Sequence, residues 1–95
     1  MAIKINPDYA DAYNNLGAVL FNAKMTEEAI DYFKEAIRVH PDFAIAHNNL
    51  GLALVAERKI EEAISHYKMA IGLKPDYAEA QKNLEKVLLR SEELE

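Results

Sequence analysis

Two pairs of adjacent glutamates are the side chains in this 95-residue sequence best suited to acid–base chemistry. Glu27 with Glu28, and Glu61 with Glu62, each offer two carboxylates, which are common general acids and bases. Both pairs stand at the same place in a repeated pattern, where a helix is expected to begin and the helix dipole favours anions. We therefore interpret them as helix-start residues and not as catalytic groups.

Three histidines are the other candidates for proton transfer or metal binding. His40, His47 and His66 do not show the short spacing of zinc ligands, and the chain has no cysteine that could complete such a site. His40 is expected at a helix C-terminus, where a partly charged imidazole complements the dipole. His66 is expected near His47 in one helical hairpin, so ordinary packing explains both.

No further motif supplies catalysis. The serines lack the strained turn of a nucleophile elbow, and the three glycines stand singly instead of forming a phosphate-binding loop. We therefore expect no enzyme activity, no cofactor and no bound metal.

Asparagines give a better candidate for binding. Asn15, Asn49 and Asn83 recur once every 34 residues. An asparagine side chain offers both a donor and an acceptor, so a regular column can bind the backbone of an extended peptide whatever its side chains. The alternative is that each asparagine bonds neighbouring backbone and only orders the repeats.

These residues are positioned by a repeat of 34 residues. Residues 7–40 and 41–74 are identical at 16 of 34 paired positions, and a third copy opens at Pro75 and covers one helix. A period of this length indicates stacked units that bury their apolar faces against one another.

Apolar residues recur at helical spacing in five segments, and no strand pattern appears. The predicted helices cover residues 10–23, 27–40, 44–57, 60–73 and 78–91. Asp8 and Thr26 are predicted N-caps, and Pro41 is expected to end the second helix. Four leucines are expected to fill the hairpin cores: Leu16, Leu20, Leu50 and Leu54. Gly17 and Gly51 are expected to let paired helices approach closely at Ala29 and Ala63.

Both copies carry a pattern that resembles the tetratricopeptide repeat. It comprises Tyr13, Leu16, Gly17, Leu20, Ala29, Phe33, Ala36 and Pro41, and then His47, Leu50, Gly51, Leu54, Ala63, Tyr67, Ala70 and Pro75. His47 departs from the large aromatic residue usual at the first position. The resemblance implies an all-α fold, a right-handed α-solenoid of antiparallel helix pairs with about two and a half repeats.

The resemblance also implies one domain with four parts. Residues 1–6 are expected to end a truncated helix, 7–40 to form repeat one, 41–74 repeat two and 75–95 a capping helix, which would make the chain a fragment of a longer array. The capping helix carries polar residues suited to a terminal position, such as Lys82, Glu85 and Lys86.

In such an array the first helix of each pair lines a concave groove that holds a peptide or helix of a partner. The residues expected there are Asn14, Asn15, Ala18, Phe21, Ile45, Asn48, Asn49, Leu52, Val55, Lys82, Asn83 and Lys86. The apolar members differ between the copies, so they would form an exposed interaction patch unless they cover one another. The asparagine column resembles the ladder in the repeats of the O-linked N-acetylglucosamine transferase.

One family function can be compared residue by residue. Repeats that bind chaperone C-termini hold a carboxylate with Lys, Asn, Asn, Lys and Arg, which align with Asn14, Ala18, Asn49, Glu79 and Asn83. Only Asn49 matches. We therefore expect no tight binding of a chaperone's acidic C-terminal tail.

The net charge and the length of the apolar runs limit the classes of partner. The net charge of −5 argues against nucleic acid, and no apolar run is long enough to span a membrane. A cytoplasmic location is the default. We expect a non-enzymatic module that binds a protein or peptide. The alternative is a structural unit that assembles with copies of itself, at its exposed ends or by exchanging elements.

Overall fold

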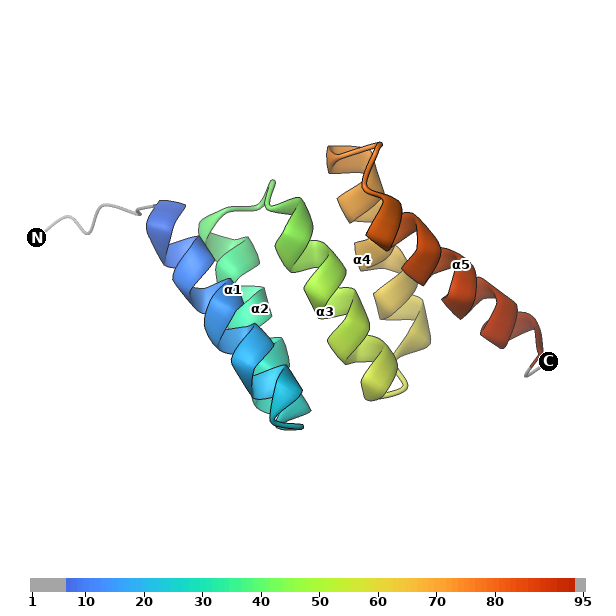
Figure 1. The fold of residues 1–95 in the computed structure, drawn as a ribbon, viewed down its shortest axis with the longest axis horizontal. Coiled ribbons are helices and arrows are strands. Elements are labelled where there is room, and N and C mark those ends of the chain that lie inside the picture. Colours follow the sequence, from blue (N-terminus) through green and yellow to red (C-terminus); the bar gives the residue numbers. More distant parts are fainter. Residues whose placement is uncertain (1–6, 94–95) are drawn as a thin grey trace, which may run out of the picture.

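The computed structural model describes residues 7–93, which form five α-helices and no strand (Figure 1). The helices are α1 (Pro7–Asn22), α2 (Thr26–Val39), α3 (Ala44–Ala56), α4 (Ile60–Leu73) and α5 (Ala78–Glu93). The predicted all-α solenoid of helix pairs is confirmed. The expectation for residues 1–6 lies outside the described residues.

The helices do not begin at the predicted caps. Because α1 begins at Pro7, Asp8 lies inside its first turn. The N-cap of α2 is Met25, which makes no side-chain capping bond, so Thr26 is the first helical residue and not a cap. Proline suits the first position of a helix, and Glu27 and Glu28 give the first turn of α2 the negative charge that the dipole favours.

The turns within both hairpins reverse the chain in the same way. Lys24 and Arg58 occupy the left-handed region, with φ of 66° and 63°. The N–H after each of them, at Met25 and Lys59, reaches back to a carbonyl five residues earlier, at 2.9 and 2.8 Å. This is the Schellman pattern that ends helices, built here on charged residues instead of glycine.

The five helices form an inner and an outer layer. Helix α1 contacts α3 and α3 contacts α5, whereas α2 and α4 do not touch each other. Each outer helix packs between two inner ones, α2 between α1 and α3 and α4 between α3 and α5 (Figure 1). The side on which α1, α3 and α5 meet is therefore the concave side of the stack, and we call it the inner face.

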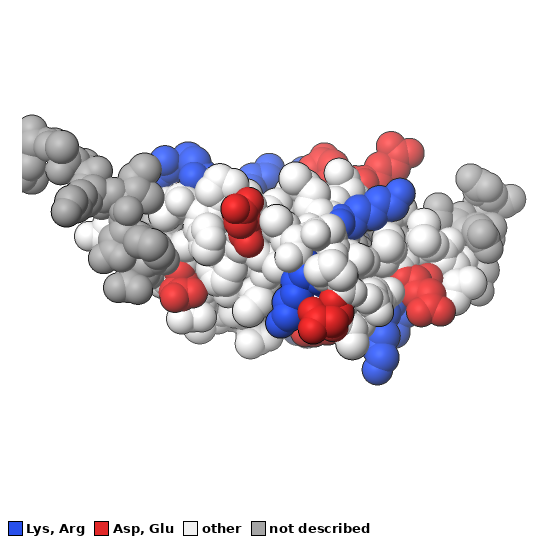
Figure 2. Space-filling view, turned by 90° about the horizontal axis from the view of Figure 1, so that it is seen from above, with Lys and Arg blue, Asp and Glu red and all other residues white. Residues whose placement is uncertain are grey.

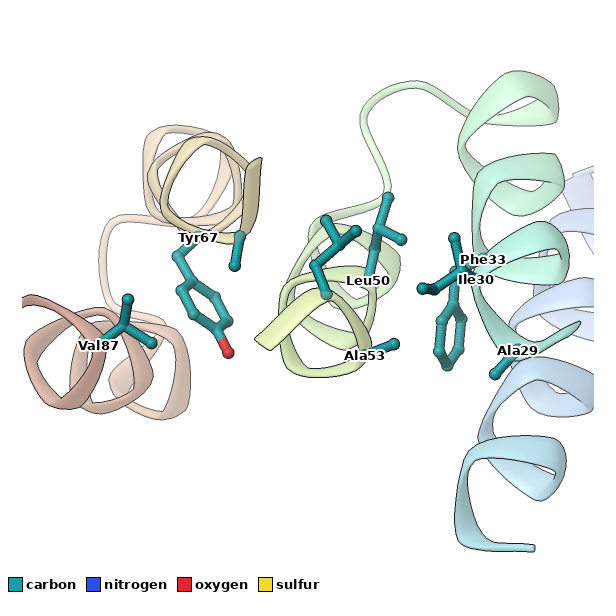
Figure 3. Packing of buried hydrophobic residues seen from close by; sticks show 9 residues of the cluster. Ala29, Ile30, Phe33, Leu50, Ala53, Tyr67 and Val87 are labelled. Atoms are coloured by element: carbon teal, nitrogen blue, oxygen red, sulfur yellow. The ribbon is translucent and has the colours of Figure 1, made fainter. Parts of the chain in front are cut away.

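The core lies between successive helices (Figure 3). Leu50 of α3 is 1% exposed and packs with Phe33 of the preceding helix α2. The prediction that Leu50 and Leu54 are core residues is confirmed, but it is wrong for Leu16, which is 45% exposed. The position that Leu16 and Leu50 share points toward the preceding repeat, and no described helix stands before α1.

The glycines of α1 and α3 lie against aromatic rings. A Cβ atom at Gly17 would come within 2.6 Å of the Phe33 ring, and one at Gly51 within 2.5 Å of the Tyr67 ring. The prediction of close approach is correct, and the nearest partners are these rings. The absent side chain makes room for the largest fully buried side chain of the facing helix.

Candidate functional site

Amide bridges join the inner helices. The Nδ2 atom of Asn49 on α3 donates to Oδ1 of Asn14 on α1 at 3.0 Å, and Nδ2 of Asn83 on α5 donates to Oδ1 of Asn48 on α3 at 3.0 Å. Of the two readings of the asparagine column, the ordering role is thus present, although the partners are side chains and not backbone. Each bridge fixes the register of one inner helix against the next.

The bridges also correct the predicted groove lining. Asn14 is 7% exposed and Asn48 1% exposed, so both lie between helices instead of on the surface. Asn49 and Asn83 are half-buried, and each amide retains a second N–H and lone pairs beyond its one bridge. Asn15, in the first repeat, is exposed. The column therefore orders the stack and still presents amide groups along the inner face.

The signal that sequence reasoning missed is the doubling of the asparagine. Asn14 precedes Asn15, and Asn48 precedes Asn49. Because the two members of a doublet point about 100° apart on a helix, one can accept a bridge from the next helix while the other donates to the previous helix. The doublet, and not the single column, predicts contacts between successive repeats.

Apolar side chains lie beside the amides. Ile45 is 45% exposed, and Ala18, Phe21, Leu52 and Val55 are half-buried. Three of these, Ala18, Phe21 and Val55, also pack against the core cluster, whereas Ile45 and Leu52 lie outside it. Three of the five are thus partly covered, by the core and not by one another. Ile45 and Leu52 provide an accessible apolar spot on α3.

The inner face becomes basic at α5. Lys82 and Lys86 are exposed and four residues apart, so they share one side of the helix with Arg90, four residues further on. Lys86 stands at the α5 position that Leu52 has on α3. On the face seen from above in Figure 2, acidic and basic side chains are scattered among uncharged ones. The inner face is therefore apolar around α3, and along α5 it is basic after Glu79 in the first turn.

A concavity is lined by the turn between α1 and α2 and by Glu57 at the end of α3. It has a volume of about 440 Å³ at the turn between α1 and α2, and its lining is largely charged, from Lys24, Met25, Thr26, Glu27, Glu28 and Glu57. Within residues 7–93, no group of three or more His, Asp or Glu side chains is arranged to hold a metal ion. None of the helices described is long and apolar enough to cross a bilayer.

The two histidines predicted to lie close together are in contact. The Nδ1 atoms of His47 and His66 are 3.0 Å apart, and the ring centroids are 5.2 Å apart. In repeat one the same two positions hold Tyr13 and Tyr32, whose ring centroids are 6.2 Å apart. The histidine pair thus takes the place of a tyrosine pair between the helices of one hairpin.

Solved structures with a similar fold are tetratricopeptide domains. The second such domain of Spaghetti (RPAP3), bound to the HSP90 peptide SRMEEVD, matches with a TM-score of 0.88 and 24% identity over 94% of this chain and 82% of that chain. The first domain of the same protein, with the same peptide, matches with a TM-score of 0.88 and 20% identity over 94% and 72%. At these identities the likeness concerns the fold.

No match was found among curated proteins. A family model, however, matches the chain directly. The model of the tetratricopeptide repeat matches residues 10–43 and 44–77, each a complete 34-residue unit. These matches cover most of the chain and both helix pairs. The chain therefore belongs to the tetratricopeptide repeat family.

Proposed function

We propose that the chain is a non-enzymatic interaction module that holds a peptide or helix of a partner protein on its inner face. The observation that carries the proposal is the accessible apolar spot of Ile45 and Leu52 beside the half-buried amide of Asn49. Apolar contact supplies affinity, and amides can pair with the backbone of the partner. The structural neighbours, which hold a peptide, support this use of the fold.

The charges on the inner face define the ligand more closely. An apolar side chain of the partner would meet Leu52, and acidic side chains would meet Lys82 and Lys86 on α5. The residues of the chaperone clamp are absent, since Glu79 and Asn83 stand where that clamp has Lys and Arg. We therefore expect internal acidic–apolar segments to bind, and a chaperone's C-terminal tail to bind no more tightly than other acidic peptides.

A displayed library of random 12-residue peptides tests the proposal. Peptides selected on the chain are expected to lose binding to the Leu52→Glu variant, while circular dichroism shows unchanged helicity. Met69→Glu is the matched control, because Met69 is 49% exposed on the outer helix α4. If selected peptides bind Leu52→Glu and the original chain equally well, or if no peptide is enriched, the inner face is not the binding site.

Self-assembly is a second candidate, supported by a stripe on α1. Tyr9, Leu16 and Val19 are 52%, 45% and 64% exposed, and Ala12 is exposed as well. The corresponding stripes on α3 and α5 are covered by α2 and α4. The spacing of three and four residues suits one packed helix. If copies pair through this stripe, the mass measured by light scattering will rise with concentration, and Leu16→Glu will abolish the rise.

A further inference from the structure

The contacts of His47 fix where its proton lies. Its Nε2 atom is 2.9 Å from the backbone carbonyl oxygen of Pro41. A carbonyl oxygen only accepts, so this nitrogen must carry the hydrogen and donate it. In a neutral imidazole the other nitrogen is then bare. Nδ1 of His47 therefore accepts, and Nδ1 of His66, at 3.0 Å, must donate.

The same geometry limits how many protons the folded pair accepts. A first extra proton goes to Nε2 of His66, on a partly exposed ring, and leaves the bond between the rings in place. A second would have to go to Nδ1 of His47, whose side chain is 1% exposed. There it would face the N–H of His66 at 3.0 Å and place two cations in stacked rings.

We propose that His47 and His66 form a proton-sensitive clasp, which joins α3 to α4 at neutral pH and opens in mildly acidic solution. The unfolded chain can protonate both imidazoles, whereas the folded pair keeps its bond only while it holds at most one extra proton. Acid therefore favours every state in which the rings separate, the unfolded state among them. Repeat one has tyrosines at both positions and carries no such device.

The groups around the clasp act in the same direction. Burial, and then the neighbouring His47, lower the pKa of His66 from its ordinary value of 6.5. Glu62, one turn earlier on α4, partly offsets this, and Lys34 on α2 adds to it. A histidine with a lowered pKa in the folded state stabilises the fold fully above the unfolded value. That stability is lost as the pH falls from about 6.5 toward the folded value.

The clasp lies beside the inner-face bridges. Asn48, which accepts the bridge from α5, and Asn49, which donates the bridge to α1, follow His47 directly on α3. Each repeat of a solenoid contacts only its neighbours, so loosening α3 from α4 affects the middle of the stack first. Opening the clasp would disturb both amide bridges while repeat one remains folded.

Urea unfolding between pH 7.5 and pH 5 tests the clasp. The matched control is the double variant His47→Tyr with His66→Tyr, which copies the tyrosine pair of repeat one; His40 is retained in both chains. Each excess proton bound by the unfolded chain changes the unfolding equilibrium tenfold per pH unit. We expect the original chain to lose on the order of tenfold to a hundredfold in stability relative to the control. If the unfolding free energies of the original chain and the double variant change with pH in parallel, the proposal is overturned.

NMR keeps the proposal testable if the double variant fails to fold. Side-chain ¹⁵N shifts of the original chain at pH 7.5 report the tautomer of each ring. We expect His47 to carry its proton on Nε2 and His66 on Nδ1, and the hydrogen bond between the rings to be lost in acid. If His47 carries its proton on Nδ1, or if the hydrogen bond between the rings persists unchanged at pH 5, there is no clasp.

Discussion

Repeats one and two have the same residue at nearly half of their positions but differ in what they bury. Leu16 of α1 is 45% exposed, while Leu50, its counterpart on α3, is 1% exposed. Val19 is 64% exposed, and its counterpart Ala53 is fully buried. The difference lies in the neighbour, because α2 covers this face of α3 whereas no described helix covers the same face of α1. In a stacked repeat, burial is a property of position in the array and not of the residue alone.

The repeats also differ inside their hairpins. The tyrosine pair of repeat one becomes a histidine pair in repeat two, where one ring bonds a backbone carbonyl and the other ring. Scaffold residues such as Gly17 and Gly51 are unchanged and meet an aromatic ring in both repeats. The two repeats therefore provide internal controls, since one substitution can be made twice in nearly identical surroundings.

The largest difference is expected for the paired leucines. Leu50→Ala empties a fully packed site and should lower the free energy of unfolding by about 2–5 kcal/mol. Leu16→Ala removes a half-exposed side chain and should cost about 1 kcal/mol or less. Urea denaturation measures both. Equal losses would mean that α1 is covered in solution, as self-assembly through its stripe requires.

A smaller difference separates two glycines of repeat two. Gly51→Ala would place a methyl group 2.5 Å from the Tyr67 ring, which is 1% exposed. We expect a loss of about 1–3 kcal/mol. Gly72→Ala meets nothing within 4 Å near the end of α4, so it should stabilise by up to about 1 kcal/mol. Thermal unfolding checks both, and a neutral Gly51→Ala would show that the ring can move.

The smallest effect is expected for the asparagine column. Asn83→Ala removes the donor to Oδ1 of Asn48, whose side chain is 1% exposed, and should cost about 1–2 kcal/mol because a buried acceptor loses its partner. Asn15→Ala, at the exposed start of the column, should change stability by less than about 0.5 kcal/mol. Chemical denaturation of both variants is the measurement. A loss at Asn15 as large as that at Asn83 would assign the whole column to stability and none of it to binding.

The fold was predictable from the sequence because the repeat itself constrains it. Because the two copies are in register, each helix can be assigned independently in both, and the proline and glycine positions agree between them. The caps at Asp8 and Thr26 were not predictable, since local side-chain bonding competes with charge and proline placement. The exposure of Leu16 and the burial of Asn48 depend on which helix stands next, which one repeat taken alone does not determine.

The candidate site was predictable only in part. Periodicity places Leu52, Val55 and Asn49 on one inner helix, and all three are half-buried there, Val55 with its side chain against the core cluster. The amide bridges and the hydrogen bond between His47 and His66 depend on atomic distances that spacing alone does not provide. For the histidines, alignment with Tyr13 and Tyr32 indicated proximity, but the proton arrangement came from the carbonyl of Pro41.

One NMR titration tests most directly whether the inner face is the recognition surface. A library-selected peptide is added to the ¹⁵N-labelled chain, and backbone shift changes are mapped onto the five helices. We predict that the changes centre on Asn49, Leu52 and Val55, extend to α1 and α5, and vanish in Leu52→Glu but not in Met69→Glu. Changes confined to α2 and α4, or to the α1 stripe, would contradict it.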